Sequence, residues 1–103
     1  MVDMSLGQLA AMEQELAAKY FSQTHDWSAA QVLQALVGEV GEYANIRKKY
    51  ERGDLSYKQF YDAARLELAD IQIYLMKLAN ILNIDMSESL TDKIAIIRGR
   101  FDK

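Results

Sequence analysis

The sequence predicts an all-α fold: a single four-helix bundle-like domain with two long antiparallel central helices. The 103 residues include no proline and only 5 glycines, and a chain so poor in helix breakers suits long uninterrupted helices. Four segments with helical apolar periodicity each begin at a capping signal, and no segment alternates apolar and polar residues for long enough to form a strand. No linker or repeat divides the chain, so we expect one domain over residues 1–103.

Capping boxes mark the four expected helix starts. In such a box, the N-cap side chain and the side chain three residues later satisfy backbone N–H groups that the helix leaves free. The pairs are Ser5–Gln8, Ser28–Gln31, Ser56–Gln59 and Asp85–Glu88. Gly53 and Asn83 follow the second and third periodic segments, and both residue types tolerate the left-handed conformation that ends a helix. These signals predict helices over residues 6–23, 29–51, 57–82 and 86–101.

Composition excludes several classes of function. Acidic residues outnumber basic ones by 15 to 12, for a net charge of −3, so the chain lacks the cationic field that binds nucleic acids and anionic membranes. We expect neither among its partners. No apolar run is long enough to cross a bilayer and no secretory signal opens the chain, so we expect a cytoplasmic protein. The absence of cysteine excludes disulfides, zinc fingers and thiol nucleophiles.

The apolar arcs of the two central helices are wider than one buried stripe requires. The arc of the second predicted helix includes Leu33, Val37 and Val40, and that of the third includes Leu68 and Leu75. Such arcs indicate burial on more than one side, which in a chain of this length favours a homodimer or homotetramer. The alternative is a monomer in which the first and last helices cover both sides.

Four carboxylates lie on or beside these arcs. At about 100° per residue, Glu39 falls inside the arc of the second predicted helix and Glu42 at its margin, and Glu67 and Asp70 repeat this arrangement on the third. Antiparallel helices that turn near residue 54 place Glu39 level with Asp70 and Glu42 level with Glu67. Carboxylates that converge there without a cation repel one another and hold protons instead of charges.

A hard divalent cation is the economical remedy, and oxygen-only ligation suits Mg²⁺, with Mn²⁺ as a substitute. The alternative is that the four acids pair with lysine and arginine or simply face water. A di-iron carboxylate site is the rival metal centre, and it needs Glu-x-x-His motifs on the helices. The sole histidine, His25, precedes the second predicted helix and forms no such motif.

Two segments carry a resemblance to a known family. The first, GEVGEYAN from Gly38 to Asn45, is followed by two lysines, and the second is ELADIQIYL from Glu67 to Leu75. They resemble the two metal motifs of the MazG-like nucleotide pyrophosphohydrolases, and residues 93–100 are similar to the C-terminal basic helix of that family. The resemblance extends over residues 25–100.

This resemblance implies an all-α assembly, dimeric or higher, that cleaves a nucleoside triphosphate to the monophosphate and pyrophosphate with Mg²⁺. It implies that Glu39, Glu42, Glu67 and Asp70 bind the metal. Many members carry an acid where this chain has Gly38, and that acid is often assigned to an extra metal or to water activation. The number of metals and the general base are therefore open, and Glu39 and Glu42 are the candidate catalytic residues.

A triphosphate needs cations beyond the metal. Lys49 and Lys77 lie seven residues beyond the second acid of each motif, and Lys93 and Arg100 share one face of the last predicted helix. We expect these four to bind phosphate; the alternative is that they border apolar arcs and extend to water. Trp27, just before the Ser28 cap, is either a stacking wall for the base or a hydrophobic staple on the first helical turn.

The function expected from these features is Mg²⁺-dependent hydrolysis of NTPs or dNTPs in nucleotide-pool housekeeping. Two alternatives stay open. A phosphoribosyl-ATP pyrophosphatase-type enzyme shares the Glu-x-x-Glu and Glu-x-x-Asp skeleton, and a non-catalytic helical interaction module could use the same scaffold.

Overall fold

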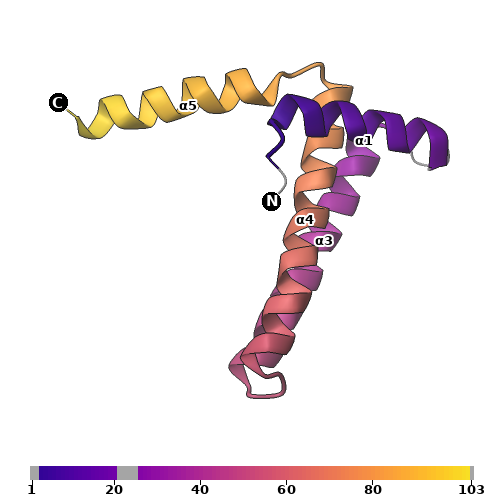
Figure 1. Cartoon of the computed structure of the whole chain (residues 1–103), viewed down its shortest axis with the longest axis vertical. Coiled ribbons are helices and arrows are strands. Elements are labelled where there is room, and N and C mark those ends of the chain that lie inside the picture. The colour runs from indigo at the N-terminus through magenta and orange to yellow at the C-terminus, as the bar shows by residue number, and fades with distance from the viewer. Residues whose placement is uncertain (1–2, 21–25, 103) are drawn as a thin grey trace.

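The computed structural model describes residues 3–20 and 26–102, and in this part of the chain its elements are four helices (Figure 1). They are α1 (Leu6–Tyr20), α3 (Ala29–Glu51), α4 (Tyr57–Ile81) and α5 (Met86–Phe101). Because these residues contain no strand, the predicted all-α class is confirmed. The last three predicted helices agree with these bounds to within one residue, and the predicted end of the first, residues 21–23, lies outside the described residues.

Local capping starts the helices where the sequence predicts. At α3, Ser28 Oγ accepts the backbone N–H of Gln31, and Gln31 Oε1 accepts the backbone N–H of Ser28. The same reciprocal pair is present at Ser56–Gln59 and Ser5–Gln8. Each box satisfies two N–H groups that have no partner within the helix.

The start of α5 shows only half of its predicted box. Asp85 Oδ1 accepts the backbone N–H groups of Ser87 and Glu88. In the described residues, the Glu88 carboxylate makes no return bond to the Asp85 N–H. Two carboxylates in one helical turn repel each other, which explains why the reciprocal half forms with glutamine at the other three starts and not with glutamate here.

Both long helices end as predicted, at residues with positive φ. Gly53 has φ 83° and Asn83 has φ 56°. At each end, this residue donates its N–H to the carbonyl three residues earlier, and the next residue donates to the carbonyl five residues before it. These are the two hydrogen bonds of a Schellman motif, which satisfies carbonyls that the last turn leaves free.

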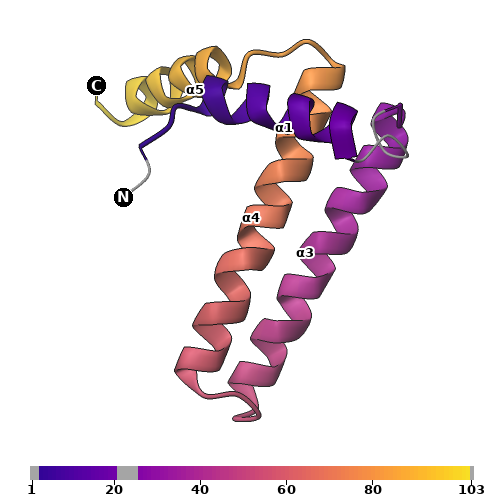
Figure 2. The ribbon, with the colours of Figure 1, turned by 45° about the vertical axis from the view of Figure 1, so that its right-hand side comes forward.

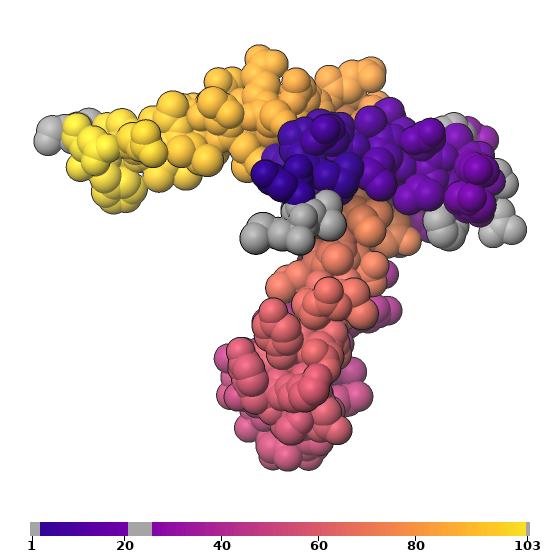
Figure 3. All heavy atoms as spheres, in the orientation of Figure 1, coloured from indigo at the N-terminus to yellow at the C-terminus, as the bar shows by residue number. Residues whose placement is uncertain are grey.

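The two long helices form an antiparallel hairpin that is closed by residues 52–56 (Figure 2). This confirms the two predicted antiparallel central helices. At the open end of the hairpin, α1 lies crosswise and packs against α4, while α5 packs against α1 and leads away to the side. The space-filling view shows the hairpin as a stem beneath a bar made by α1 and α5 (Figure 3).

The buried core of this arrangement is small. Its apolar residues come from three helices: Ala17, Val32, Phe60, Ala64, Met76 and Ala79. The radius of gyration is 16.3 Å, whereas a compact chain of this length has one of about 13 Å. In the described residues, α1 and α5 therefore leave much of the length of the hairpin uncovered. Among the described residues, no helix combines the length and apolarity needed to cross a membrane.

Candidate functional site

The hairpin brings three of the predicted metal ligands together. Glu39 comes from α3, and Glu67 and Asp70 come from α4, where a spacing of three residues places both on one helix face. One carboxylate oxygen from each of the three lies within 4.8 Å of the other two. The two helices run in opposite directions, so residues far apart in sequence meet at the same level.

Each of the two carboxylates at the centre of this group has one oxygen without a hydrogen-bond partner. Glu39 and Glu67 are partly buried, and Oε2 of each is buried without a hydrogen-bond partner. A buried polar atom left in this way costs about 1–3 kcal/mol, more when it carries a charge. A proton, a water molecule or a cation bound at these atoms would lower this cost.

The pKa of Glu39 is raised from 4.5 to about 7, and burial of the carboxyl is the largest cause. The other causes are a hydrogen bond that the protonated Glu39 side chain shares with Glu67 and the charges of Glu42, Asp70 and Glu67. Each of these effects disfavours the ionised carboxylate. Near neutral pH, Glu39 is thus poised between holding a proton and carrying a charge.

Glu42 lies apart from the other three acids. Its side chain is exposed, and its carboxylate is not part of the group in which oxygens lie within 4.8 Å. Its charge still raises the pKa of Glu39 one helical turn away. The structure thus places Glu42 at the margin of the acid cluster (Glu39, Glu67 and Asp70), and its role as a ligand stays a prediction.

Tyr74 is a neighbour of the cluster that the sequence analysis did not single out as a site residue. Burial, followed by the charges of Glu39, Asp70 and Glu42, raises the pKa of its phenol. The hydroxyl therefore keeps its proton and is available as a hydrogen-bond donor beside the acids. Its position four residues after Asp70, on the same face of α4, is the sequence signal that could have found it.

The acid cluster fits a hard divalent cation. Its donors are all carboxylate oxygens, the ligand type that Mg²⁺ and Mn²⁺ prefer, and two of them are buried without partners. No ion pair in the described part of the chain involves Glu39, Glu67 or Asp70. Neutralisation by lysine or arginine, the alternative weighed from the sequence, is thus not the arrangement seen at these three residues.

Lys77 is buried where α4 packs against α1. Its Nζ is 3.0 Å from Glu13 Oε1, and both side chains are about one-tenth exposed. Asn80 Nδ2 donates to Glu13 Oε2 at 3.1 Å and to the Ala10 carbonyl at 3.3 Å. The structure therefore gives Lys77 a partner within the chain, and its predicted phosphate role needs this pair to open.

The other predicted phosphate-binding residues are exposed. Lys49 lies in the last turn of α3. Lys93 and Arg100 lie on α5, which leads away from the hairpin that carries the acids (Figure 1). Within one chain, the structure does not bring Lys93 and Arg100 to the acid cluster.

Trp27 is partly buried just before the Ser28 cap. Val32, four residues after the cap, is fully buried, so the two occupy the positions of a hydrophobic staple. Both interpretations of Trp27 stay predictions. His25 lies outside the described residues.

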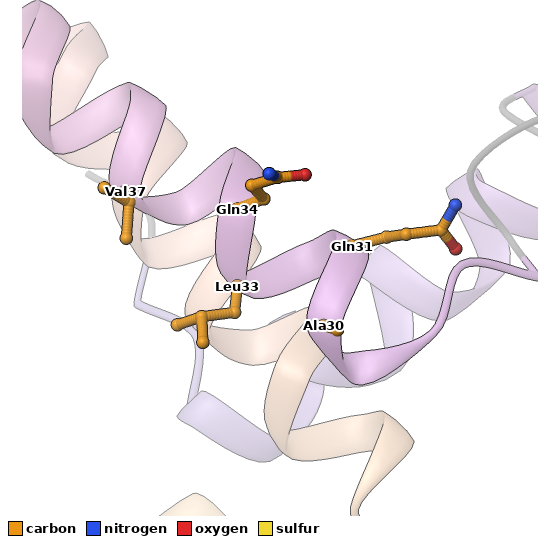
Figure 4. A pocket seen from close by; sticks show the side chains of 5 residues that line it. All are labelled: Ala30, Gln31, Leu33, Gln34 and Val37. Atoms are coloured by element: carbon orange, nitrogen blue, oxygen red, sulfur yellow. The ribbon is translucent and has the colours of Figure 1, made fainter.

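A shallow depression of about 400 Å³ lies beside the first half of α3 (Figure 4). Its described lining consists of Ala30, Gln31, Leu33, Gln34 and Val37. This lining is mainly apolar and includes none of the acids, so the depression is a feature separate from the acid cluster.

Comparison of the chain with models of known protein families, and with curated protein sequences, finds no match.

Proposed function

We propose that this chain hydrolyses nucleoside triphosphates to the monophosphate and pyrophosphate, with Mg²⁺ held by Glu39, Glu67 and Asp70. The observation that carries the proposal is the pair of buried, unpartnered oxygens, Oε2 of Glu39 and of Glu67, inside a group of three converging carboxylates. The order of the two acidic motifs, which resembles that of the MazG-like nucleotide pyrophosphohydrolases, supports the choice of reaction.

The proposed products define the bond that breaks. Release of pyrophosphate cleaves the anhydride between the α- and β-phosphates, while the oxygen of a water molecule bonds to phosphorus and its proton passes to a base. A bound divalent cation would neutralise the phosphates and lower the pKa of the attacking water. The chain's own contribution is to hold three carboxylates close together between the two helices of the hairpin.

We assign Glu42 as the general base that accepts the proton of the attacking water. Glu42 is exposed and lies beside the cluster without belonging to its closely spaced oxygens, so it keeps free lone pairs to accept a proton. Glu39, the other candidate, is proposed as a ligand of the cation instead. Lys49, on the same face of α3 seven residues beyond Glu42, is the nearest predicted phosphate contact along that helix.

A substrate panel tests the activity. The protein is incubated with each NTP and dNTP and with phosphoribosyl-ATP in the presence of Mg²⁺, and pyrophosphate is measured. Release from one or more NTPs or dNTPs is the expected result. Release from phosphoribosyl-ATP alone would assign the chain to the alternative enzyme, and no release from folded protein would overturn the enzymatic proposal.

Matched variants assign the residues. Glu67→Gln removes one ligand charge and should abolish turnover, since removing a ligand from a cation site disables it. Glu15→Gln alters an exposed glutamate on α1 and should leave turnover unchanged. Equal rates for the two variants, with helical circular dichroism intact, would show that Glu67 is not a ligand.

A further inference from the structure

Helix α5 carries an apolar stripe that the described part of the chain leaves largely exposed. Its members recur at the spacing i, i+4, i+7 and i+11, one face of a helix: Leu90, Ile94, Ile97 and Phe101. None of the residues of α5 is buried, and Ile94 and Phe101 are 53% and 81% exposed. A stripe of this length and regularity normally packs against another element.

A second stripe of the same spacing is uncovered on α3. It consists of Leu33, Val37, Val40 and Ala44. Val37 is 62% exposed, and Leu33 and Val40 are about half exposed. The shallow depression described above lies along this stripe, since Leu33 and Val37 are part of its lining (Figure 4).

The two stripes match in length but do not meet within one chain. Each extends over twelve residues of helix, about 16 Å from the first to the last. The connection from α4 to α5 is short and fixed at both ends, by the Schellman motif at Asn83 and by the Asp85 cap. It directs α5 away from the hairpin (Figures 1 and 2).

The chain exposes more surface than a compact monomer of its mass, as expected if a partner covers part of it. The chain exposes 7908 Å², whereas a compact monomer of 11.8 kDa exposes about 5,900 Å². The excess, about 2,000 Å², is well above the ~800 Å² that each partner buries in a standard interface and falls in the range of obligate dimers.

We propose that α5 of one copy of this chain docks along the α3 stripe of a second copy, and that the second copy returns the same contact. A second copy is the occupant because the chain itself supplies both matching stripes. A reciprocal exchange of this kind buries both stripes of both copies and closes as a two-fold dimer without leaving a free end. Lys93 and Arg98 lie beside the α5 stripe and are positively charged. Gln31 and Gln34, which flank the α3 stripe, are neutral and therefore do not repel them.

Molar mass in solution gives the first test. Ile94 and Ile97 are replaced together by aspartate, and Ile96, a 52% exposed isoleucine on another face of α5, is replaced by aspartate as the control. Light scattering is expected to show a dimer for the unmodified chain and for the Ile96→Asp variant, and a monomer for the double variant. A monomeric unmodified chain, or a double variant that stays dimeric, overturns the proposal.

Cross-linking identifies the contacting helices. Because the chain has no cysteine, a cysteine placed at Val37 or Val40 in one preparation and at Ile94 or Ile97 in another is the only thiol in each. A short bifunctional maleimide should join an α3 variant to an α5 variant when the two are mixed and exchanged. Cross-links that form only between two α3 variants, or no cross-link in any of the four mixtures, overturn the proposal. Both tests are independent of whether the chain hydrolyses nucleotides.

Discussion

Glu39 and Glu42 lie one turn apart on the same helix, yet their surroundings differ. Glu39 faces two other acids across the hairpin and has an oxygen buried without a partner, whereas Glu42 is exposed. Burial, followed by its acidic neighbours, raises the pKa of Glu39 to about 7. The position of each carboxylate relative to water, and not its residue type, thus separates a candidate ligand from a candidate base.

This environment predicts how the metal-free protein responds to pH. The pKa of Glu39 is 4.5 without perturbation and about 7 in the folded chain, so between these values the folded state binds more protons than the unfolded state. The free energy of unfolding should therefore fall as pH rises from about 5 to 7 and level off above. Urea denaturation in EDTA measures this slope, which Glu39→Gln should remove. An equal slope in that variant would show that Glu39 is not its source.

The buried pair of Lys77 and Glu13 predicts non-additive effects of mutation. Removing one partner leaves a buried charge alone, so Lys77→Met should lower the free energy of unfolding by about 3 kcal/mol. Replacing both residues, Lys77→Met with Glu13→Leu, should recover much of that loss. Urea denaturation measures each change, and Lys58→Met, at the exposed pair with Asp62, is the control with an expected loss under about 1 kcal/mol. A double variant as unstable as the sum of its singles would contradict this account.

At the scale of the helices, the ends are set by local chemistry. Gly53 has φ 83°, and a Cβ added there would meet no atom within 4 Å. A substitution at Gly53 therefore lowers stability only because other residues disfavour this left-handed backbone conformation. Gly53→Ala should lower the free energy of unfolding by about 1 kcal/mol. Gly99→Ala, within α5 and equally free of contacts, should raise it by about 0.5–1 kcal/mol. Thermal denaturation of the pair checks this, and equal shifts in one direction would contradict it.

The helix boundaries could be predicted because caps act within a few residues of the chain. Ser28 and Ser56 form their boxes, and Gly53 and Asn83 end the helices as expected. The glutamate box at Asp85 forms only in half, because the residue pattern did not take account of repulsion between its two carboxylates. Of the site, the convergence of Glu39, Glu67 and Asp70 followed from helical periodicity and reflection about the turn.

What the sequence analysis missed depends on contacts between distant elements. Glu13 lies on a face of α1 with Ala10 and Ala17, three and four residues away, so it is an acid within an apolar arc like Glu39. The pairing of Glu13 with Lys77 could not be derived, because periodicity does not say which helix α1 packs against. The same reason left the direction of α5 unknown, since an apolar stripe indicates burial without identifying the partner.

At the scale of the whole molecule, the open shape and the small core lead us to expect that folding is coupled to the proposed association. A chain with only six buried apolar residues among those described gains stability from any surface that a second copy covers. Its melting temperature should therefore rise with protein concentration. Calorimetry over a hundredfold concentration range measures this, and the dependence should vanish in the Ile94→Asp, Ile97→Asp variant. A melting temperature that is constant for the unmodified chain would contradict the coupling.

Isothermal titration calorimetry with Mn²⁺ tests most directly whether the acid cluster is a cation site. The unmodified chain and the Glu15→Gln control should bind Mn²⁺ with the same affinity, and Mg²⁺ should compete. Glu67→Gln should lose this binding, because it removes one of the two buried oxygens that lack a partner. Equal binding by Glu67→Gln and Glu15→Gln, or no binding by the unmodified chain, would contradict the assignment.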